Sequence, residues 1–146
     1  MSTAPARLLV APARARWQTV ALLILQVALG AAFLLAGASK LAGAAPMVAL
    51  FDAIGFGTWL RYLTGLIEIS GAILLFTPVL AGVSAIALIG VMAGAILTHL
   101  FVLHTSPAAP VMTLVALTIV AYARRAEIID VLNRLRGRRP VARHDH

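Results

Sequence analysis

Four stretches of the sequence carry almost no charge and approach the length that a helix needs to cross a lipid bilayer. They lie at about residues 17–41, 59–77, 81–103 and 108–122, and the last is the shortest. A helix needs about 20 apolar residues to cross a hydrocarbon layer about 30 Å thick. Lipid offers no partners to open backbone groups, so each span has to be helical. The four stretches therefore predict an all-α fold built as a four-helix transmembrane bundle.

The overall composition fits a membrane protein and excludes other classes. Hydrophobic residues make up 62% of the chain and charged residues only 12%, against near half and about a quarter in ordinary soluble domains. This excludes a soluble globular enzyme and a disordered chain. The chain has no cysteine, so disulfides and thiolate metal sites within it are excluded. No metal site is expected from histidines either, because His99 and His104 do not share one helical face.

The basic residues gather at the two ends of the chain. Three arginines precede residue 17 and seven follow residue 123, while only Lys40 and Arg61 lie between. Basic segments stay on the cytoplasmic side, and an even number of spans brings both termini to one side. We therefore expect a multi-pass protein of the cell membrane, with cytoplasmic tails at 1–16 and 124–146 and a membrane domain at 17–123. No nucleic-acid recognition motif accompanies the charge, so the bilayer is the expected partner of the tails.

Two segments outside the spans are expected to lie along the membrane. Residues 46–58 are rich in apolar and aromatic side chains and contain Gly55 and Gly57, which predicts an interfacial or re-entrant half-helix on the outer side. The residues after Tyr122 predict a basic amphipathic helix on the cytoplasmic surface, and a solvated tail is the alternative. The apolar face of this helix consists of Ile128, Ile129, Leu132 and Leu135.

A carboxylate, Glu68, lies near the middle of the second span. A charge at this depth costs about 2.5–3.5 kcal/mol on insertion scales, so we expect Glu68 to be protonated or paired. Arg61, Thr64 and Glu68 share one helical face that leads inward from the outer surface. The first span carries a matching stripe from Gln26, expected at the depth of Glu68, to Lys40 near its outer end. We expect the two stripes to face each other, with glycines at the contact.

These stripes predict a polar cavity in the outer half of the bundle. In the third span, His99 lies about one turn inside the outer boundary, and the small residues from Gly90 to Gly94 predict a helix-packing face. Intramembrane carboxylates are functional by default, so Glu68 and His99 are candidate catalytic residues that exchange protons with a bound molecule. The candidate substrate-binding residues are Lys40, Arg61, Gln26 and Thr64.

The charged candidates and His99 also have purely structural interpretations. Glu68 can be a buried anchor that pairs with Lys40 or Arg61 and fixes the helix register. Lys40 can extend its amine to the interface, and Arg61 can anchor its helix at the interface. His99 can be a hydrogen-bonded packing residue. The sequence leaves both interpretations open for all four side chains.

Three segments resemble signatures of a known family. Residues 30–41, GAAFLLAGASKL, resemble the first-helix signature of DoxX-like membrane proteins. Residues 65–75, GLIEISGAILL, look like the second-helix signature, with Ala72 at a position where the family usually has a second glycine. Residues 95–99, AILTH, look like the end of the third helix. The resemblance implies a four-helix integral protein of a bacterial or archaeal cell membrane. The positions that it singles out are Lys40, Glu68 and His99.

The resemblance also implies a role in membrane redox systems. Relatives include the small subunit of a thiosulfate–quinone oxidoreductase and a membrane assembly that handles oxidative and thiol stress. We therefore expect a subunit or accessory of such a system, with a soluble or membrane oxidoreductase partner and a cavity for a quinone or another small redox-active molecule. Whether the chain catalyses a reaction itself, and whether it forms a homo-oligomer, stays open. The alternatives are a non-catalytic membrane scaffold or assembly partner and, third, a small-solute permease in which Arg61 and Lys40 attract an anion.

Overall fold

The structure is a computed structural model that describes residues 16–77 and 79–137, and every regular element in these ranges is an α-helix. The all-α prediction is therefore confirmed, and helices lie within a few residues of each of the four stretches predicted as spans. Most of the predicted N-terminal tail and the last part of the C-terminal tail lie outside the described residues. The helices are α1 (Arg16–Leu41), α2 (Ala45–Ile54), α3 (Thr58–Leu74), α4 (Ala81–Phe101), α5 (Ala108–Ala123) and α6 (Arg125–Gly137).

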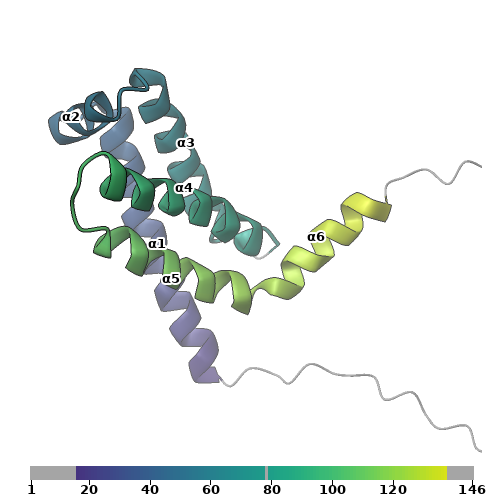
Figure 1. Ribbon diagram of the computed structural model, residues 1–146. Coiled ribbons are helices and arrows are strands. Elements are labelled where there is room, and N and C mark those ends of the chain that lie inside the picture. Colours follow the sequence, from purple (N-terminus) through teal and green to yellow (C-terminus); the bar gives the residue numbers. More distant parts are fainter. Residues whose placement is uncertain (1–15, 78, 138–146) are drawn as a thin grey trace, which may run out of the picture.

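Four of these helices form two pairs that cross each other. α1 packs along α3 and α4 packs along α5, while α3 also contacts α4 and α5 also contacts α1 (Figure 1). The four helices therefore enclose a common interior. α2 lies where α1 leads into α3, and α6 projects away from the crossed pairs (Figure 1). The buried apolar residues of the interior are Leu22, Leu29, Phe33, Ala72, Leu75, Ala85, Leu88, Leu117 and Val120.

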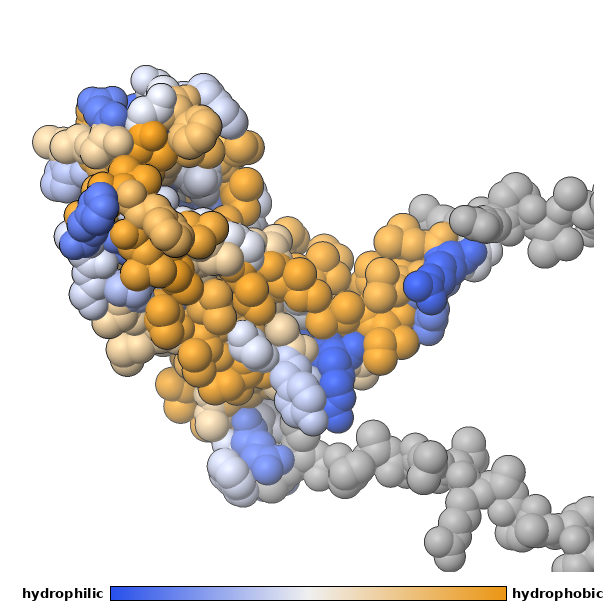
Figure 2. All heavy atoms as spheres, viewed as in Figure 1, coloured by the Kyte–Doolittle hydropathy of each residue, from blue (hydrophilic) through white to orange (hydrophobic). Residues whose placement is uncertain are grey.

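The exterior of the bundle is apolar. α1 and α4 are long and apolar enough to cross a membrane, whereas α3 and α5 are shorter, with 17 and 16 residues. Only 28% of the apolar stretch of α1 and 33% of that of α4 is buried, while the core helix of a soluble protein is mostly buried. Figure 2 shows apolar side chains over much of the visible surface. An apolar exterior of this extent is the surface that a membrane protein presents to lipid.

Glycines bring α1 and α3 into close contact. A Cβ atom on Gly37 would lie 2.8 Å from the carbonyl oxygen of Gly65, and a Cβ atom on Gly65 would lie 3.2 Å from the carbonyl oxygen of Gly37. Real Cβ atoms essentially never show the first separation, and the second is tighter than most Cβ contacts, so glycine at both positions allows the two backbones to approach this closely. The predicted glycine contact between the first two spans is therefore confirmed.

The packing between α3 and α4 loosens along its length. A Cβ atom on Gly71 of α3 would lie 2.7 Å from the side chain of Leu88, which marks tight packing near the α3–α4 turn. A Cβ atom on Gly90 or Gly94 of α4 would meet nothing within 4 Å. The helix-packing face predicted at Gly90 to Gly94 is therefore wrong, because no neighbouring helix lies within contact of these two glycines, although α4 packs along α5. The space that opens is the candidate site.

The predicted half-helix between the first two spans is present as α2. Pro46 lies in its first turn, and Gly55, with a φ of 79°, ends it in a left-handed conformation. Gly57, with a φ of 81°, then starts α3 in a new direction. Residues with side chains rarely adopt such positive φ values, so the two glycines set the sharp change of direction between α2 and α3.

The amphipathic helix predicted after Tyr122 is present as α6, with one difference. Ile129, Leu132 and Leu135 are exposed as expected. Ile128 instead packs on α4, where a Cβ atom on Gly82 would lie 2.6 Å from its side chain. The base of α6 is therefore attached to the bundle, while its outer turns present an uncovered apolar face among the described residues.

Candidate ligand cavity

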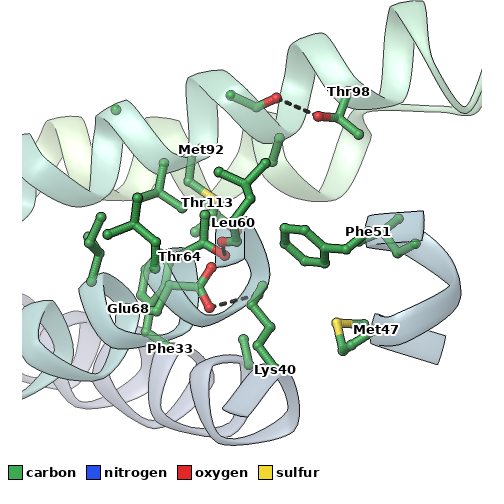
Figure 3. A pocket seen from close by; sticks show the side chains of 18 of the residues that line it. Phe33, Lys40, Met47, Phe51, Leu60, Thr64, Glu68, Met92, Thr98 and Thr113 are labelled. Atoms are coloured by element: carbon green, nitrogen blue, oxygen red, sulfur yellow. Dashed lines mark hydrogen bonds and ion pairs between the residues drawn. The ribbon is translucent and has the colours of Figure 1, made fainter. Parts of the chain in front are cut away.

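A cavity of about 830 Å³ lies among α1, α3 and α4, with α2 along one side. Most of its wall is apolar and includes Phe33, Met47, Phe51 and Met92 (Figure 3). Its volume falls in the range of pockets that hold small organic ligands, about 300–1,000 Å³. The polar side chains that line it are Lys40, Thr64, Glu68, Thr98, His99 and Thr113.

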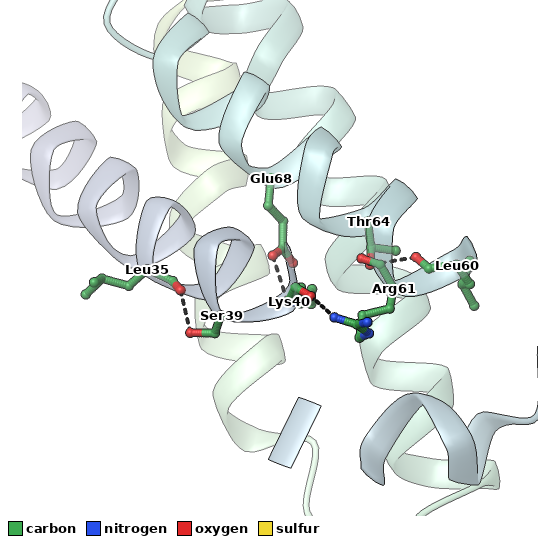
Figure 4. A network of polar contacts seen from close by, with 7 residues as sticks. All are labelled: Leu35, Ser39, Lys40, Leu60, Arg61, Thr64 and Glu68. Carbon is green, nitrogen blue, oxygen red and sulfur yellow. Dashed lines mark hydrogen bonds and ion pairs between the residues drawn. The ribbon is translucent and has the colours of Figure 1, made fainter. Parts of the chain in front are cut away.

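Lys40 and Glu68 form an ion pair between α1 and α3. Lys40 Nζ donates a hydrogen bond to Glu68 Oε2 at 2.7 Å, and the two side chains are 12% and 3% exposed (Figure 4). The close contact at Gly65 positions the pair, because a Cβ atom on Gly65 would lie only 3.1 Å from Lys40 Cβ. Of the two partners considered for Glu68, the geometry selects Lys40. The opposite charges compensate each other, so this wall of the cavity carries a strong dipole with no net charge.

Arg61 is buried but does not line the cavity. Its guanidinium donates to the backbone carbonyl of Lys40 and lies 4.5 Å from the ring centre of Tyr62. The same carbonyl accepts a hydrogen bond from the amide of Gly43, whose φ of 69° forms a glycine C-cap on α1. A cation is favourable at a helix C-terminus. Arg61 therefore fixes the end of α1, and with it the backbone of Lys40, against the start of α3.

Thr64 and His99 lie on different walls of the cavity. The Thr64 hydroxyl, on the α3 wall beside Glu68, donates to the carbonyl of Leu60 at 2.9 Å. His99, on the α4 wall, has its Nδ1 2.8 Å from the hydroxyl of Thr105. That hydrogen bond orients the ring and leaves Nε2 as the nitrogen for a second partner. Polar groups therefore lie on both the α3 and α4 walls of a mainly apolar space.

Gln26 lies outside the cavity, toward the other end of α1. Its side chain donates to the carbonyl of Leu75 at 2.8 Å and accepts from the guanidinium of Arg124 at 3.0 Å. α1 and α3 run antiparallel, so Lys40 is level with Glu68, and residues 26 to 40 span about 21 Å of helix. The expectation that Gln26 lies at the depth of Glu68 is therefore wrong. Gln26 instead joins α1 to the end of α3 and to the α5–α6 junction.

Two parts of the cavity wall were not predicted from the sequence to line a cavity. The first is α2, whose side chains at positions 47, 50, 51 and 54 face the cavity. Their i, i+3, i+4, i+7 spacing is the signal of one apolar helical face. The second is the backbone of α4 at Gly90 and Gly94, which the cavity exposes.

The polar side chains of the cavity are of types that can form hydrogen bonds and exchange protons. Lys40 Nζ keeps two further N–H groups after it donates to Glu68, and Glu68 and His99 can each take up or release a proton. No group of three or more side chains that could hold a metal ion occurs within the part of the chain that the structure describes. The arrangement can therefore hold a small molecule and supply or accept protons at its oxygens.

Comparison with known proteins shows that the residues of the cavity wall lie within a region that matches a recognised sequence family. The model described as "DoxX-like family" matches residues 24–123, which is more than half of the chain and includes every polar residue of the cavity wall. Neither a curated protein nor a solved structure matches the chain. The family match therefore begins within α1, covers α2 to α5 in full and ends before α6 begins.

Proposed function

The chain belongs to the DoxX-like family of membrane proteins, and from this premise we propose that its cavity binds a quinone or a similar small redox-active ring. In this proposal the protein acts as a subunit or accessory of a membrane oxidoreductase system. The observation that carries the proposal is the Lys40–Glu68 ion pair on the wall of an otherwise mainly apolar cavity. Such pockets hold ligands that combine apolar surface with a few polar atoms.

A quinone ring matches the distribution of polar groups. Its faces are apolar, and its carbonyl oxygens lie on opposite edges of the ring. One oxygen would accept a hydrogen bond from Lys40 Nζ, while the other would lie toward His99 on the α4 wall. The apolar side chains of α2, including Phe51, would cover the ring (Figure 3). This pose uses the polar groups on both walls and buries the apolar faces of the ligand.

Proton exchange is the part of the reaction that these side chains can perform. Reduction of a quinone to a quinol takes up two electrons and two protons. Glu68 and His99 would exchange the protons with the two ring oxygens, and Lys40 would polarise the oxygen nearest to it. The electrons would come from an electron-donating oxidoreductase partner, in line with an accessory role. Oxidation of a quinol runs the same exchange in reverse.

The ion pair gives less support to an anion permease. Lys40 is compensated by Glu68, and Arg61 is directed at a backbone carbonyl. Neither cation therefore offers an uncompensated charge to a solute. A non-catalytic scaffold would need no ligand in the cavity, so a binding measurement separates it from the proposed function.

Partial filling of the cavity is expected to weaken quinone binding strongly. In Gly94→Leu the new side chain enters open space, since a Cβ atom there meets nothing within 4 Å, so the fold should be retained. Binding of a short-chain quinone to the purified protein in detergent, followed by tryptophan fluorescence or calorimetry, should weaken more than tenfold. Ala93→Leu is the matched control, because Ala93 is an exposed neighbour on α4 that does not line the cavity. Equal binding by Gly94→Leu and the wild type, or no binding by the wild type, would reject the proposal.

Single polar substitutions test the roles within the site. Glu68→Gln keeps an oxygen that can accept from Lys40 but removes the carboxylate that can take up and release a proton, and His99→Ala removes the α4 ring. His99→Ala is expected to weaken quinone binding about tenfold, the effect of one lost hydrogen bond, whereas Glu68→Gln leaves Lys40 able to donate and should keep most of the affinity. In turnover with an electron-donating partner, the Glu68→Gln variant should lose rate beyond its loss of affinity. Unchanged binding and turnover would remove that residue from the proposed mechanism.

We propose that α1, α3, α4 and α5 cross the cell membrane, with both termini cytoplasmic and the cavity in the outer half. The apolar exterior and the arginines at the chain ends support this topology.

The chain has no cysteine of its own, so single introduced cysteines report topology directly. A membrane-impermeant maleimide should label Ala53→Cys on α2 in intact cells and Asp130→Cys on α6 only after permeabilisation. The opposite labelling pattern would invert the topology.

A further inference from the structure

A second, smaller groove lies between the start of α1 and the end of α5. Its volume is about 370 Å³, and it shares no lining residue with the cavity. The wall is mainly apolar and includes Leu22, Leu25 and Ile119, while Trp17 and Tyr122 lie at one end. Both aromatic side chains are largely exposed. Trp and Tyr favour the boundary between lipid headgroups and acyl chains, so the groove has an apolar body and an interfacial end.

A fixed cation lies at this interfacial end. The guanidinium of Arg125 lies 4.4 Å from the ring centre of Tyr122 and donates to the carbonyl of the same residue at 3.0 Å. Arg124 next to it is engaged by Glu127 and Gln26. Within residues 16–77 and 79–137, Arg125 forms no ion pair with a carboxylate. Its charge is therefore held in place beside the groove without a compensating anion from these residues.

We propose that this groove binds one anionic phospholipid, with an acyl chain against the apolar wall and the phosphate on Arg125. A phospholipid of this kind would occupy both the apolar groove and the site beside the cation. An inorganic anion would pair with the cation but would leave the groove unfilled. The same end of the molecule carries α6, whose exposed Leu132 and Leu135 accompany Arg134 and Arg136. A helix of this kind lies on an anionic membrane surface, which places the groove at the headgroup level.

Binding of defined lipids to the full-length protein tests the headgroup part of the proposal. In native mass spectrometry from detergent, phosphatidylglycerol should bind at least about fivefold more tightly than phosphatidylcholine. Arg125→Gln should remove this preference. Arg134→Gln, which loses the same charge farther along α6, should keep it. Equal loss in both variants would show a general charge effect and overturn the proposal, as would equal binding of the two lipids.

A second pair of variants tests the groove itself without changing charge. Ala21 is exposed and lines the groove, so the indole ring of Ala21→Trp should fill the groove. This variant should no longer bind phosphatidylglycerol in native mass spectrometry. Ala28→Trp is the matched control on an exposed face of α1 outside the groove. Glycerol 3-phosphate, which has the anionic group without acyl chains, should not compete. Retention of the lipid by Ala21→Trp, or competition by glycerol 3-phosphate, would reject an acyl-chain site.

Discussion

Replacement of Lys40 by methionine is expected to destabilise the protein by about 3–5 kcal/mol. The substitution keeps most of the side-chain volume but leaves Glu68, which is 3% exposed, without the amine that neutralises it. An uncompensated buried charge costs far more than the lost hydrogen bond alone. The free energy of unfolding of the purified protein, measured by denaturant titration in one fixed detergent, reports this loss directly.

The double variant Lys40→Met with Glu68→Leu is the control for this prediction. Replacement of both members of a buried pair by apolar residues is often neutral or stabilising, so the double variant should be more stable than Lys40→Met alone. It should also lose quinone binding, which would separate the stability of the fold from the function of the site. If the two substitutions instead destabilise additively, the pair does not act as a coupled unit and its proposed structural role is wrong.

The energetics of charge in lipid made the central role of Glu68 predictable from the sequence. Glu68 lies in an apolar span, and a carboxylate at that depth requires a partner. The identity of the partner could not be predicted, because Lys40 and Arg61 both lie near the outer ends of their spans. That choice depends on how α1 and α3 are aligned, which the Gly37–Gly65 contact sets. The alignment also explains why Gln26 lies far from the site.

Glycines in α4 show the limit of pattern-based prediction more clearly. Gly90 and Gly94 have the spacing of a helix-packing motif, yet they border the cavity. A small residue permits close packing but does not require it, and the outcome depends on where the neighbouring helices go. The crossing of the α4–α5 pair over the α1–α3 pair is a property of the whole fold (Figure 1). Composition and spacing do not encode it locally.

Substitution of Gly37 by alanine is expected to destabilise the protein by about 1–3 kcal/mol. The added Cβ atom would lie 2.8 Å from the carbonyl oxygen of Gly65 and 3.2 Å from the amide nitrogen of Ile69. Both are backbone atoms, so a side-chain rotation cannot relieve the contact, and α1 has to move away from α3. Denaturant titration of the variant and the wild type in the same detergent measures the difference.

Gly90→Ala isolates the clash from the general effect of removing a glycine. Both substitutions make the same change inside a helix, and alanine favours the helix by about 1 kcal/mol, but the new Cβ atom at Gly90 meets nothing within 4 Å. Gly90→Ala should therefore keep or raise stability. Separation of α1 from α3 also draws Lys40 away from Glu68, so Gly37→Ala should weaken quinone binding although it adds no atom to the cavity wall. Equal stability of the two variants would mean that the close helix contact does not hold the ion pair in place.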